Sequence, residues 1–346
     1  MKAAQAPKRR GAGLTRRPWW PAAKRTLLVA FFALVGWLLY EQAREIEWSQ
    51  VGATLARYPW TTLALAAALA AASHAIYSGF DLIGKHWTGH TLPVRQVVPV
   101  TFVSYAFNLN LGSLVGGIAF RYRLYARLGL DNATTTRVLA ASLVTNWLGY
   151  LALAGVVFAL GIVTPPEGWK IGALALRGLG AGLLFVALAY LLLCAFSKRR
   201  EWSVRGHSFE LPPLRLALLQ FGVSTLNWSL IAGVVFVLLG QRIDYPVVLG
   251  VLLLAAVAGV VAHIPAGLGV LEAVFVALLG GQIAKPELLA ALIAYRAIYY
   301  LAPLAIAIVV YLRLEAGAKK SRQANQAGGK RRRAPDSPAR PASARG

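Results

Sequence analysis

Glu272 and Arg296 are ionisable residues that lie inside long apolar runs of the sequence. A carboxylate or a guanidinium removed from water is costly unless it is paired, hydrated or neutralised. We therefore expect these two side chains to face each other or a shared cavity. One of them would then contact a substrate or carry a proton. The alternative is a structural ion pair that only fixes the packing of its segments.

Aromatic residues surround Arg296. Tyr295 and Tyr299 are spaced to share one face of a helix, while Arg296 and Tyr300 share the adjacent face. This arrangement predicts a cation and several hydroxyl groups in one belt, and Pro303 would loosen or kink the helix one turn later. The alternative is that the tyrosines are interfacial aromatic anchors.

Two breaks rich in glycine interrupt the apolar runs. The short helix after each break would aim its positive N-terminal dipole and free amide groups inward, which makes a site for an anion such as a phosphodiester. Besides Glu272, Arg296, Tyr295 and Tyr299, the residues that we expect at such a site are Asn110, Gly112, Gly117, Arg121, Pro265, Gly267 and Gly269. The alternative is a pair of simple turns with satisfied carbonyl groups, and Arg121 as an ordinary loop residue.

Other polar residues lie on or near the apolar runs, namely His74, Ser78, Asp81, Thr145, Asn146, Ser224, Thr225 and Asn227. The first three fall on one helix face, so they are candidates to line a cavity. Serine, threonine and asparagine more often hold helices together than bind ligands. Asp81 also fits a place at the interface with water.

The composition indicates what must position these residues. The chain has 346 residues, of which 58% are apolar and 14% are charged, and its mean hydropathy is +0.58. Soluble domains carry about 25% charged residues, so we predict a polytopic membrane protein built from helices. The single cysteine, Cys194, excludes a disulfide framework and a cysteine metal site.

Apolar blocks define the expected elements, at residues 26–40, 61–80, 97–120, 138–163, 171–196, 214–240, 247–281 and 288–312. A helix needs about 20 residues to cross the hydrocarbon core. Blocks 97–120 and 247–281 are broken near their middles, so we expect neither arm of either block to reach that length. Breaks of this kind are tolerated at membrane depth where protein or a water-filled cavity satisfies the backbone.

The distribution of charge selects the topology. If every block crosses, the basic loops 121–137 and 197–215 face outward, against the positive-inside rule. If the two broken blocks are re-entrant, both loops and both termini are cytoplasmic. We therefore predict an all-α fold with six spans and two re-entrant helical hairpins. Residues 26–163 and 171–312 would then be inverted repeats, as in many secondary transporters.

The two ends of the chain carry much of its net charge of +23. We expect residues 1–25 and 313–346 to be basic cytoplasmic tails attracted to anionic lipid, the second of them disordered. The basic run at 330–333 has neither aromatic residues nor a recognition helix around it, so we expect no specific nucleic-acid partner.

Motifs for catalysis are lacking. The sequence has no Walker lysine motif, and its glycine-rich stretch 266–272 follows an apolar segment where a nucleotide loop needs a βαβ strand. The histidines have no spacing typical of a metal site. We expect neither an enzyme nor a resident metal or cofactor.

The broken blocks and the last span resemble the lysylphosphatidylglycerol synthase transmembrane-region family. The positions that carry this resemblance are Asn110, Gly112, Gly117, Arg121, the segment Pro265-Ala266-Gly267-Leu268-Gly269-Val270 with Glu272, Tyr295-Arg296 and Pro303. The likeness covers about residues 25–313. Ala266 stands where the family commonly has a second glycine, which is a small change in the turn.

The resemblance implies a flippase-like membrane region that moves a lipid between leaflets. Some members of the family are fused to a soluble aminoacyl-transferase domain, which we do not expect in the short segment after Arg313. Carried over to this sequence, the lipid head-group route would be lined by Glu272, Arg296, Arg121 and the two glycine turns.

Our leading hypothesis is a bacterial-type inner-membrane lipid translocase that acts on an anionic phospholipid or a related envelope lipid. Arg296 and the hairpin helix N-termini would hold phosphate, and Glu272 would orient Arg296 or couple to protons. One alternative is a carrier or channel for a small ion or solute. Another is a non-transporting scaffold for envelope enzymes. The sequence is compatible with a monomer and with a homo-oligomer.

Overall fold

The computed structural model describes residues 48–166, 172–198, 201–204, 207–262 and 267–316. The expectations for the tail 1–25, for the apolar block 26–40 and for Pro265 fall outside these residues, as does nearly all of the expected tail 313–346.

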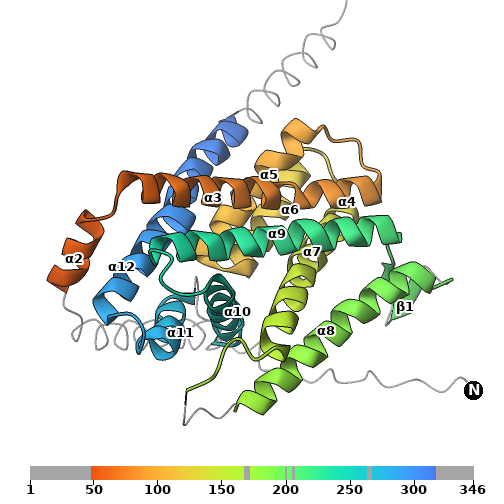
Figure 1. The fold of residues 1–346 in the computed structure, drawn as a ribbon. Coiled ribbons are helices and arrows are strands. Elements are labelled where there is room, and N and C mark those ends of the chain that lie inside the picture. The colour runs from red at the N-terminus through yellow and green to blue at the C-terminus, as the bar shows by residue number, and fades with distance from the viewer. Residues whose placement is uncertain (1–47, 167–171, 199–200, 205–206, 263–266, 317–346) are drawn as a thin grey trace, which may run out of the picture. The chain divides into compact units, whose positions relative to one another are not determined.

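Helices make up almost all of the described chain (Figure 1). Up to the middle of the chain they are α2 (Trp48–Ala56), α3 (Trp60–Ser78), α4 (Phe80–Thr88), α5 (Val94–Leu111), the π-helical η2 (Ser113–Ala119), α6 (Phe120–Arg127), α7 (Asn132–Ala159) and α8 (Ala173–Phe196). They continue with α9 (Leu214–Leu238), α10 (Tyr245–Ala262), α11 (Val270–Leu279), α12 (Lys285–Tyr295) and the π-helical η4 (Arg296–Leu301). A short antiparallel hairpin of β1 (Glu201–Val204) and β2 (His207–Glu210) departs from the all-α expectation, with Glu201 paired to Glu210.

Within the described residues, six helices are long and apolar enough to cross a membrane. They are Trp60–Thr88, Asn132–Ala159, Ala173–Phe196, Leu214–Leu238, Tyr245–Ala262 and Lys285–Ala316. The prediction of a helical multi-pass membrane protein is therefore confirmed.

The expectation for the first arm of block 247–281 was wrong. This arm is α10, which has 18 residues and reaches spanning length. The helix begins at Tyr245, before the apolar run, and continues to Ala262. The second arm, α11, has 10 residues and stays short, as expected. The first arm of block 97–120 is α5, which is also longer than expected at 18 residues, but it is not among the helices apolar enough to span.

Each broken block folds back on itself as a helical hairpin. In the first, Gly112 has a φ of +83°, and the chain returns along α5 so that the rings of Phe107 and Phe120 stack 4.3 Å apart. In the second, α11 packs back on α10, and Gly259 faces the backbone of Gly267. Glycine serves both turns, since positive φ is strained for other residues.

The helices α3 and α9 lie side by side and run in opposite directions (Figure 1). Their ends meet where the hydroxyl of Tyr58 donates to the carbonyl oxygen of Leu238 at 2.6 Å. Their middles meet where the hydroxyl of Ser73 donates to Oδ1 of Asn227 at 2.8 Å. This antiparallel pair forms the frame on which the polar centre is built.

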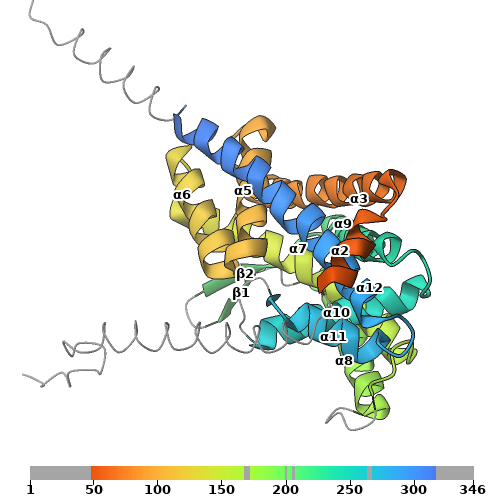
Figure 2. The same ribbon diagram turned by 90° about the vertical axis from the view of Figure 1, so that its left-hand side faces the viewer.

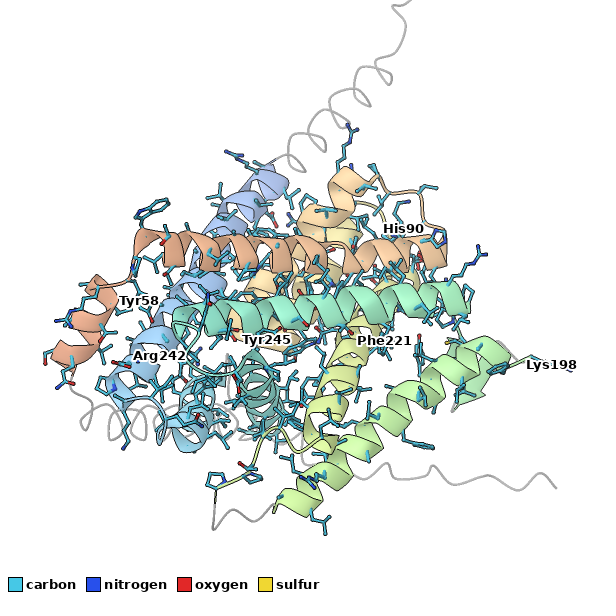
Figure 3. The ribbon with its side chains drawn as sticks, viewed as in Figure 1. Tyr58, His90, Lys198, Phe221, Arg242 and Tyr245 are labelled. Carbon is cyan, nitrogen blue, oxygen red and sulfur yellow. The ribbon has the colours of Figure 1, made fainter. Side chains whose placement is uncertain are left out.

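Opposite ends of the α3–α9 pair carry different polar residues. Figure 3 places Tyr58 and Arg242 near one end, and His90 and Lys198 near the other. Arg242 donates to Glu287 at 2.6 Å. Lys198 belongs to the basic loop 197–215, which the sequence analysis predicts to be cytoplasmic.

Two apolar cores support these elements. The larger one joins buried side chains of α7 and α9 to those of α10, α11 and α12. The smaller one joins α5 and α6 to the end of the last helix through residues such as Val103, Leu124 and Ala307. Figure 2 shows α5 and α6 together beside that end. The first hairpin is therefore anchored to the last span.

Candidate functional site

Arg296 and Glu272 form a bidentate ion pair. Nε of Arg296 donates to Oε1 of Glu272 at 2.5 Å, and Nη2 donates to Oε2 at 3.0 Å. Nη2 also donates to the carbonyl oxygen of Gly267 at 3.1 Å. The side chains of the arginine and the glutamate remain 16% and 20% exposed. The sequence expectation that these two residues face each other agrees with this geometry.

The glycine turn before α11 places Glu272. Gly267 and Gly269 both have positive φ, +56° and +77°, so the backbone can reverse there without strain. Gly269 caps α11, and Glu272 lies in the first turn. A carboxylate at that position is stabilised by the helix dipole. The turn therefore presents both a carbonyl group and a carboxylate to Arg296.

Arg296 begins the π-helical segment η4, which ends at Leu301. Pro303 follows, and because proline has no N–H it removes one backbone hydrogen bond from the helix. Wide π-type turns occur where the regular α-helical pattern is disturbed, often at functional sites. The guanidinium carbon of Arg296 lies 5.5 Å from the ring centroid of Tyr300, so these two residues share a face as expected.

The tyrosines on the other face are interior residues. Tyr295 and Tyr299 stack with their centroids 5.4 Å apart, and they are 2% and 1% exposed. This burial excludes the alternative that they are interfacial anchors. They are also much less exposed than the side chains of the ion pair at Arg296.

Tyr299 joins a buried group that we call the central cluster, which consists of Ser73, His74, Tyr105, Asn227 and Tyr299. The hydroxyl of Tyr299 shares hydrogen bonds with the hydroxyls of Ser73, at 2.7 Å, and Tyr105, at 2.9 Å. The ring of His74 lies 4.7 Å from that of Tyr299. The cluster connects α3, α5, α9 and η4 at one point.

Two atoms of the central cluster have no hydrogen-bond partner in the described structure. They are Nε2 of His74 and Nδ2 of Asn227. Nδ1 of His74 is bonded to the carbonyl oxygen of Ala70 at 2.9 Å. Buried polar atoms usually find partners, so the cluster has unused capacity for hydrogen bonding.

Arg121 forms a second ion pair, with Asp81. Nε and Nη2 of Arg121 donate to the two carboxylate oxygens at 3.0 and 3.2 Å, and Tyr125 donates its hydroxyl to Oδ2 at 2.8 Å. Asp81 is 0% exposed, so a place for it at the water interface is wrong. The side chains of Arg121 and Tyr125, both from α6, cover this carboxylate.

The remaining donors of Arg121 also find partners inside the protein. Nη1 donates to the carbonyl oxygen of Gly117 at 3.2 Å, and Nη2 donates to Ser142 at 3.3 Å. Arg121 is 2% exposed. An incoming anion would have to break the pair with Asp81, so this geometry favours a structural role for Arg121 over the head-group contact that we expected.

The first break is packed tightly instead of open. A Cβ atom at Gly116 would collide with the backbone of Phe107 and Asn108, so glycine is needed there for the close approach, while one at Gly117 would lie 3.0 Å from Oδ1 of Asn108. Asn110 donates to the carbonyl oxygens of Ala106 at 2.8 Å and Tyr300 at 3.3 Å. These contacts tie the break to η4. They agree with the alternative interpretation, a turn whose carbonyl groups are satisfied. At Gly112, in contrast, an added Cβ atom would meet no other atom within 4 Å.

Access distinguishes the two ion pairs. Asp81 and Arg121 are sealed, whereas Glu272 and Arg296 are each partly exposed. Of these two pairs in the described structure, the second is the more accessible. In the described part of the chain, no group of three or more His, Cys, Asp or Glu residues could hold a metal ion.

The fold and this site define a helical multi-pass membrane protein with a partly exposed ion pair beside a helical hairpin. The family described as the lysylphosphatidylglycerol synthase transmembrane region matches residues 26–307. The chain belongs to this family, as its resemblance at the breaks and the last span implied.

Three relatives illustrate its range. The inner membrane protein YbhN of Escherichia coli (strain K12) is 46% identical over 311 residues, which cover 90% of this chain and 98% of YbhN. The uncharacterized protein slr0712 of Synechocystis is 31% identical over 260 residues, 74% of this chain and 80% of that protein. A phosphatidylglycerol lysyltransferase of Staphylococcus haemolyticus is 23% identical over 248 residues, 68% of this chain but 27% of the transferase. The similarity to YbhN and the apolar helices support a multi-pass inner-membrane protein.

Proposed function

We propose that this protein is an inner-membrane lipid translocase that moves an anionic phospholipid, or a related envelope lipid, between leaflets. The observation that carries the proposal is the partly exposed Arg296–Glu272 pair, which joins the glycine turn before the short apolar helix α11 to the last helix of spanning character. Intramembrane ionisable residues commonly mark substrate or proton pathways. The sealed pair of Arg121 and Asp81 has no such access.

The family supports the choice of a lipid. One relative is named a phosphatidylglycerol lysyltransferase, so its substrate is an anionic phospholipid, and this chain matches 27% of its length. Arg296 offers the planar, bidentate donor geometry that suits phosphate oxygens. A phosphodiester is therefore the substrate group that we assign to this site.

Competition for Arg296 supplies a mechanism. A phosphate group would accept the two hydrogen bonds that Glu272 accepts in the structure. The displaced carboxylate would then need a proton or water, because an isolated charge at this depth is costly. Release of the lipid would return Arg296 to Glu272. Each cycle would thus couple phosphate binding at Arg296 to protonation of Glu272.

The membrane topology belongs to the same proposal. We place both helical hairpins, α5–α6 and α10–α11, as re-entrant elements of two inverted repeats, with both termini in the cytoplasm. The antiparallel pairing of α3 and α9 supports it, because the span formed by α3 and α4 and the span α9 each directly precede a hairpin in their halves of the chain. Secondary transporters place their substrates where such discontinuous elements meet.

The test is leaflet exchange in liposomes. Purified protein would be reconstituted with a fluorescent anionic phospholipid, and the wild type would be compared with Glu272→Gln. We expect exchange with the wild type and loss of exchange with the variant, since glutamine cannot take part in the charge competition. The matched control is Glu287→Gln, which breaks the surface pair with Arg242 and should leave exchange intact.

Two results would contradict the proposal. Equal exchange by the wild type and Glu272→Gln would remove the ion pair from the mechanism. Transport of a soluble ion across the same vesicles without movement of lipid would favour a carrier or channel for a small solute.

A further inference from the structure

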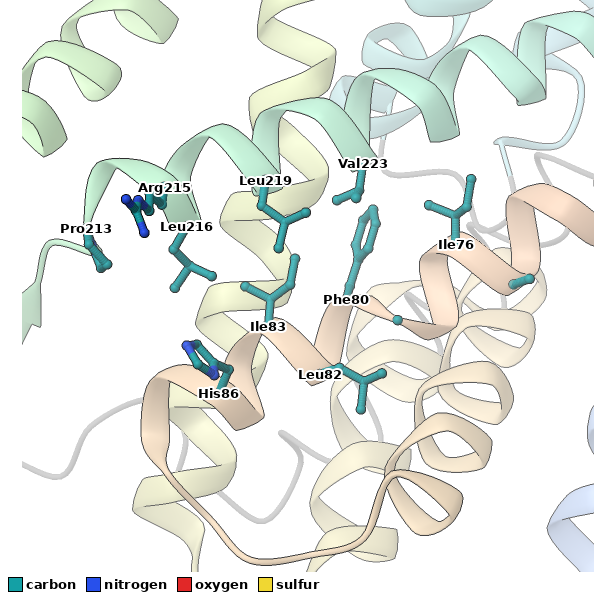
Figure 4. A pocket seen from close by; sticks show the side chains of 12 residues that line it. Ile76, Phe80, Leu82, Ile83, His86, Pro213, Arg215, Leu216, Leu219 and Val223 are labelled. Carbon is teal, nitrogen blue, oxygen red and sulfur yellow. The ribbon is translucent and has the colours of Figure 1, made fainter.

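A groove lies between the junction of α3 and α4 and the start of α9. Its volume is about 690 Å³, and it lies between α3–α4 on one side and α9 on the other (Figure 4). The apolar side chains that form its walls are Ile76, Phe80, Ile83, Leu216, Leu219 and Val223. Both helical walls belong to segments of membrane-spanning character, so the groove opens where lipid would lie.

One end of the groove is polar. Among the residues that line it, His86 and Arg215 carry the polar side chains, and Figure 4 shows them on opposite walls at the same end of the groove, near Pro213. Both side chains are exposed. Arg215 ends a basic loop, which the positive-inside rule places at the cytoplasmic face. The groove therefore has a cationic head and an apolar body.

The length of the groove matches one leaflet. From Pro213 to Val223, α9 advances about 15 Å at 1.5 Å per residue. One leaflet contributes about half of a hydrocarbon core that is roughly 30 Å thick. An acyl chain laid along the groove would thus reach from the membrane surface to the bilayer centre. There Ile76 lies within a few residues of Ser73 and His74 of the central cluster.

Charge must supply the selectivity. Lipid tails surround a membrane protein on all sides and are as apolar as the groove, so an apolar wall alone does not favour one lipid over another. An arginine at the head-group level distinguishes lipids with net negative charge, and its fork binds phosphate oxygens in bidentate geometry. The combination selects an anionic phospholipid.

We propose that this groove is a binding site for one anionic phospholipid of the cytoplasmic leaflet, with its phosphate at Arg215 and His86 and an acyl chain between α4 and α9. The proposal that lipid binds here rests only on the shape and the charge of the groove. A role as the entry from which lipid reaches the ion pair of Arg296 rests on the proposed translocase function.

The experiment is lipid retention by the full-length protein in native mass spectrometry. Delipidated protein would be titrated with phosphatidylglycerol and with phosphatidylcholine of identical acyl chains. We expect one phosphatidylglycerol to be retained about tenfold more strongly, and Arg215→Gln to abolish that preference. Arg137→Gln is the control, because Arg137, like Arg215, is an exposed arginine near the start of a long apolar helix but does not line the groove.

A second pair of variants tests the apolar body. Leu219 lines the groove and is 50% exposed, while its neighbour Leu218 does not line it and is 51% exposed. Tryptophan at either exposed position should be tolerated by the fold. Leu219→Trp should lower retention of phosphatidylglycerol, and Leu218→Trp should leave it unchanged. A phosphatidylglycerol with a photoactivatable chain should cross-link to α4 and α9.

Defined outcomes would overturn the site. These are an unchanged preference in Arg215→Gln, an equal loss in both tryptophan variants, or cross-links spread evenly over all exposed helices. Occupation of the groove by a second copy of the chain, seen as cross-links between α9 helices, would also overturn it. Failure of the translocase would be seen separately, as retained binding without leaflet exchange.

Discussion

Asp81 and Arg121 are joined by two hydrogen bonds of 3.0 and 3.2 Å in a site where neither side chain is more than 2% exposed. The pair connects α4 of the first described span to α6, the returning arm of the first hairpin. Tyr125 donates a third hydrogen bond to the same carboxylate. The ion pair therefore fastens the hairpin to the span.

Asp81→Asn should destabilise the protein strongly. The change leaves Arg121 buried without its counter-ion, which costs about 3 to 5 kcal/mol for a buried pair. Unfolding of the detergent-solubilised protein by heat or denaturant would measure the loss. Glu287→Gln breaks an exposed pair and should cost about 1 kcal/mol or less. A similar loss in both variants would show that the buried pair is not a clamp.

Close helix packing gives a second prediction, at Gly149. A Cβ atom there would lie 2.3 Å from Oγ of Ser224 and 2.5 Å from the backbone nitrogen of Thr225. Backbone atoms cannot move aside cheaply, so Gly149→Ala should separate α7 from α9. We expect a loss of about 1 to 3 kcal/mol in the same unfolding measurement.

Gly222 provides the control for that substitution. It is also inside a helix, α9, but a Cβ atom would meet nothing within 4 Å. Gly222→Ala should leave stability unchanged or raise it slightly, because alanine favours helix more than glycine does. If both alanine variants behave alike, the contact between α7 and α9 does not depend on the missing side chain.

The spans could be predicted because their signal is local. An apolar run of sufficient length reports a spanning helix whatever its neighbours do, and α7, α8 and α9 follow their blocks closely. The Arg296–Glu272 pair could also be predicted, for a different reason. Two opposite charges in apolar surroundings have few favourable arrangements, and facing each other is one of them.

Burial of Asp81 could not be read from the sequence. The apolar run ends at about that residue, and Lys85 and His86 follow, which is the local pattern of a helix that reaches water. Arg121 and Tyr125 reach the carboxylate from α6, which packs on α5 and α7, the two helices on which α4 also packs. Such contacts depend on tertiary arrangement, as do those of the central cluster.

Tyr299 yields a third prediction, which separates structure from transport. Its hydroxyl contacts Ser73 and Tyr105, and the side chain is 1% exposed, so a lipid head group does not reach it. Tyr299→Phe should cost about 1 kcal/mol for the lost hydrogen bonds. Leaflet exchange per folded molecule should remain near the wild-type rate. Loss of exchange as complete as that of Glu272→Gln would instead make Tyr299 a contact of the substrate.

The N-terminus of α7 supplies a pH-dependent prediction, outside the membrane-spanning segments. The carboxylate of Asp131 caps this helix by accepting hydrogen bonds from Oγ1 of Thr134 at 2.7 Å and from its backbone N–H at 2.9 Å. These bonds to the charged form lower the pKa of Asp131 below its ordinary value of 3.8. The ionised cap therefore favours the folded helix end.

Acid should remove this contribution. Because the folded state has the lower pKa, the stabilisation is present above the unfolded pKa and is lost as the pH falls through the folded pKa. Hydrogen exchange at the first turn of α7, corrected for intrinsic rates, would compare the wild type with Asp131→Asn. Asparagine caps a helix without titrating, so wild-type protection should exceed that of the variant at about pH 6, and the excess should decrease as the pH falls below the ordinary Asp131 pKa of 3.8. An excess that is the same at both pH values would mean that ionisation of Asp131 does not stabilise this helix end.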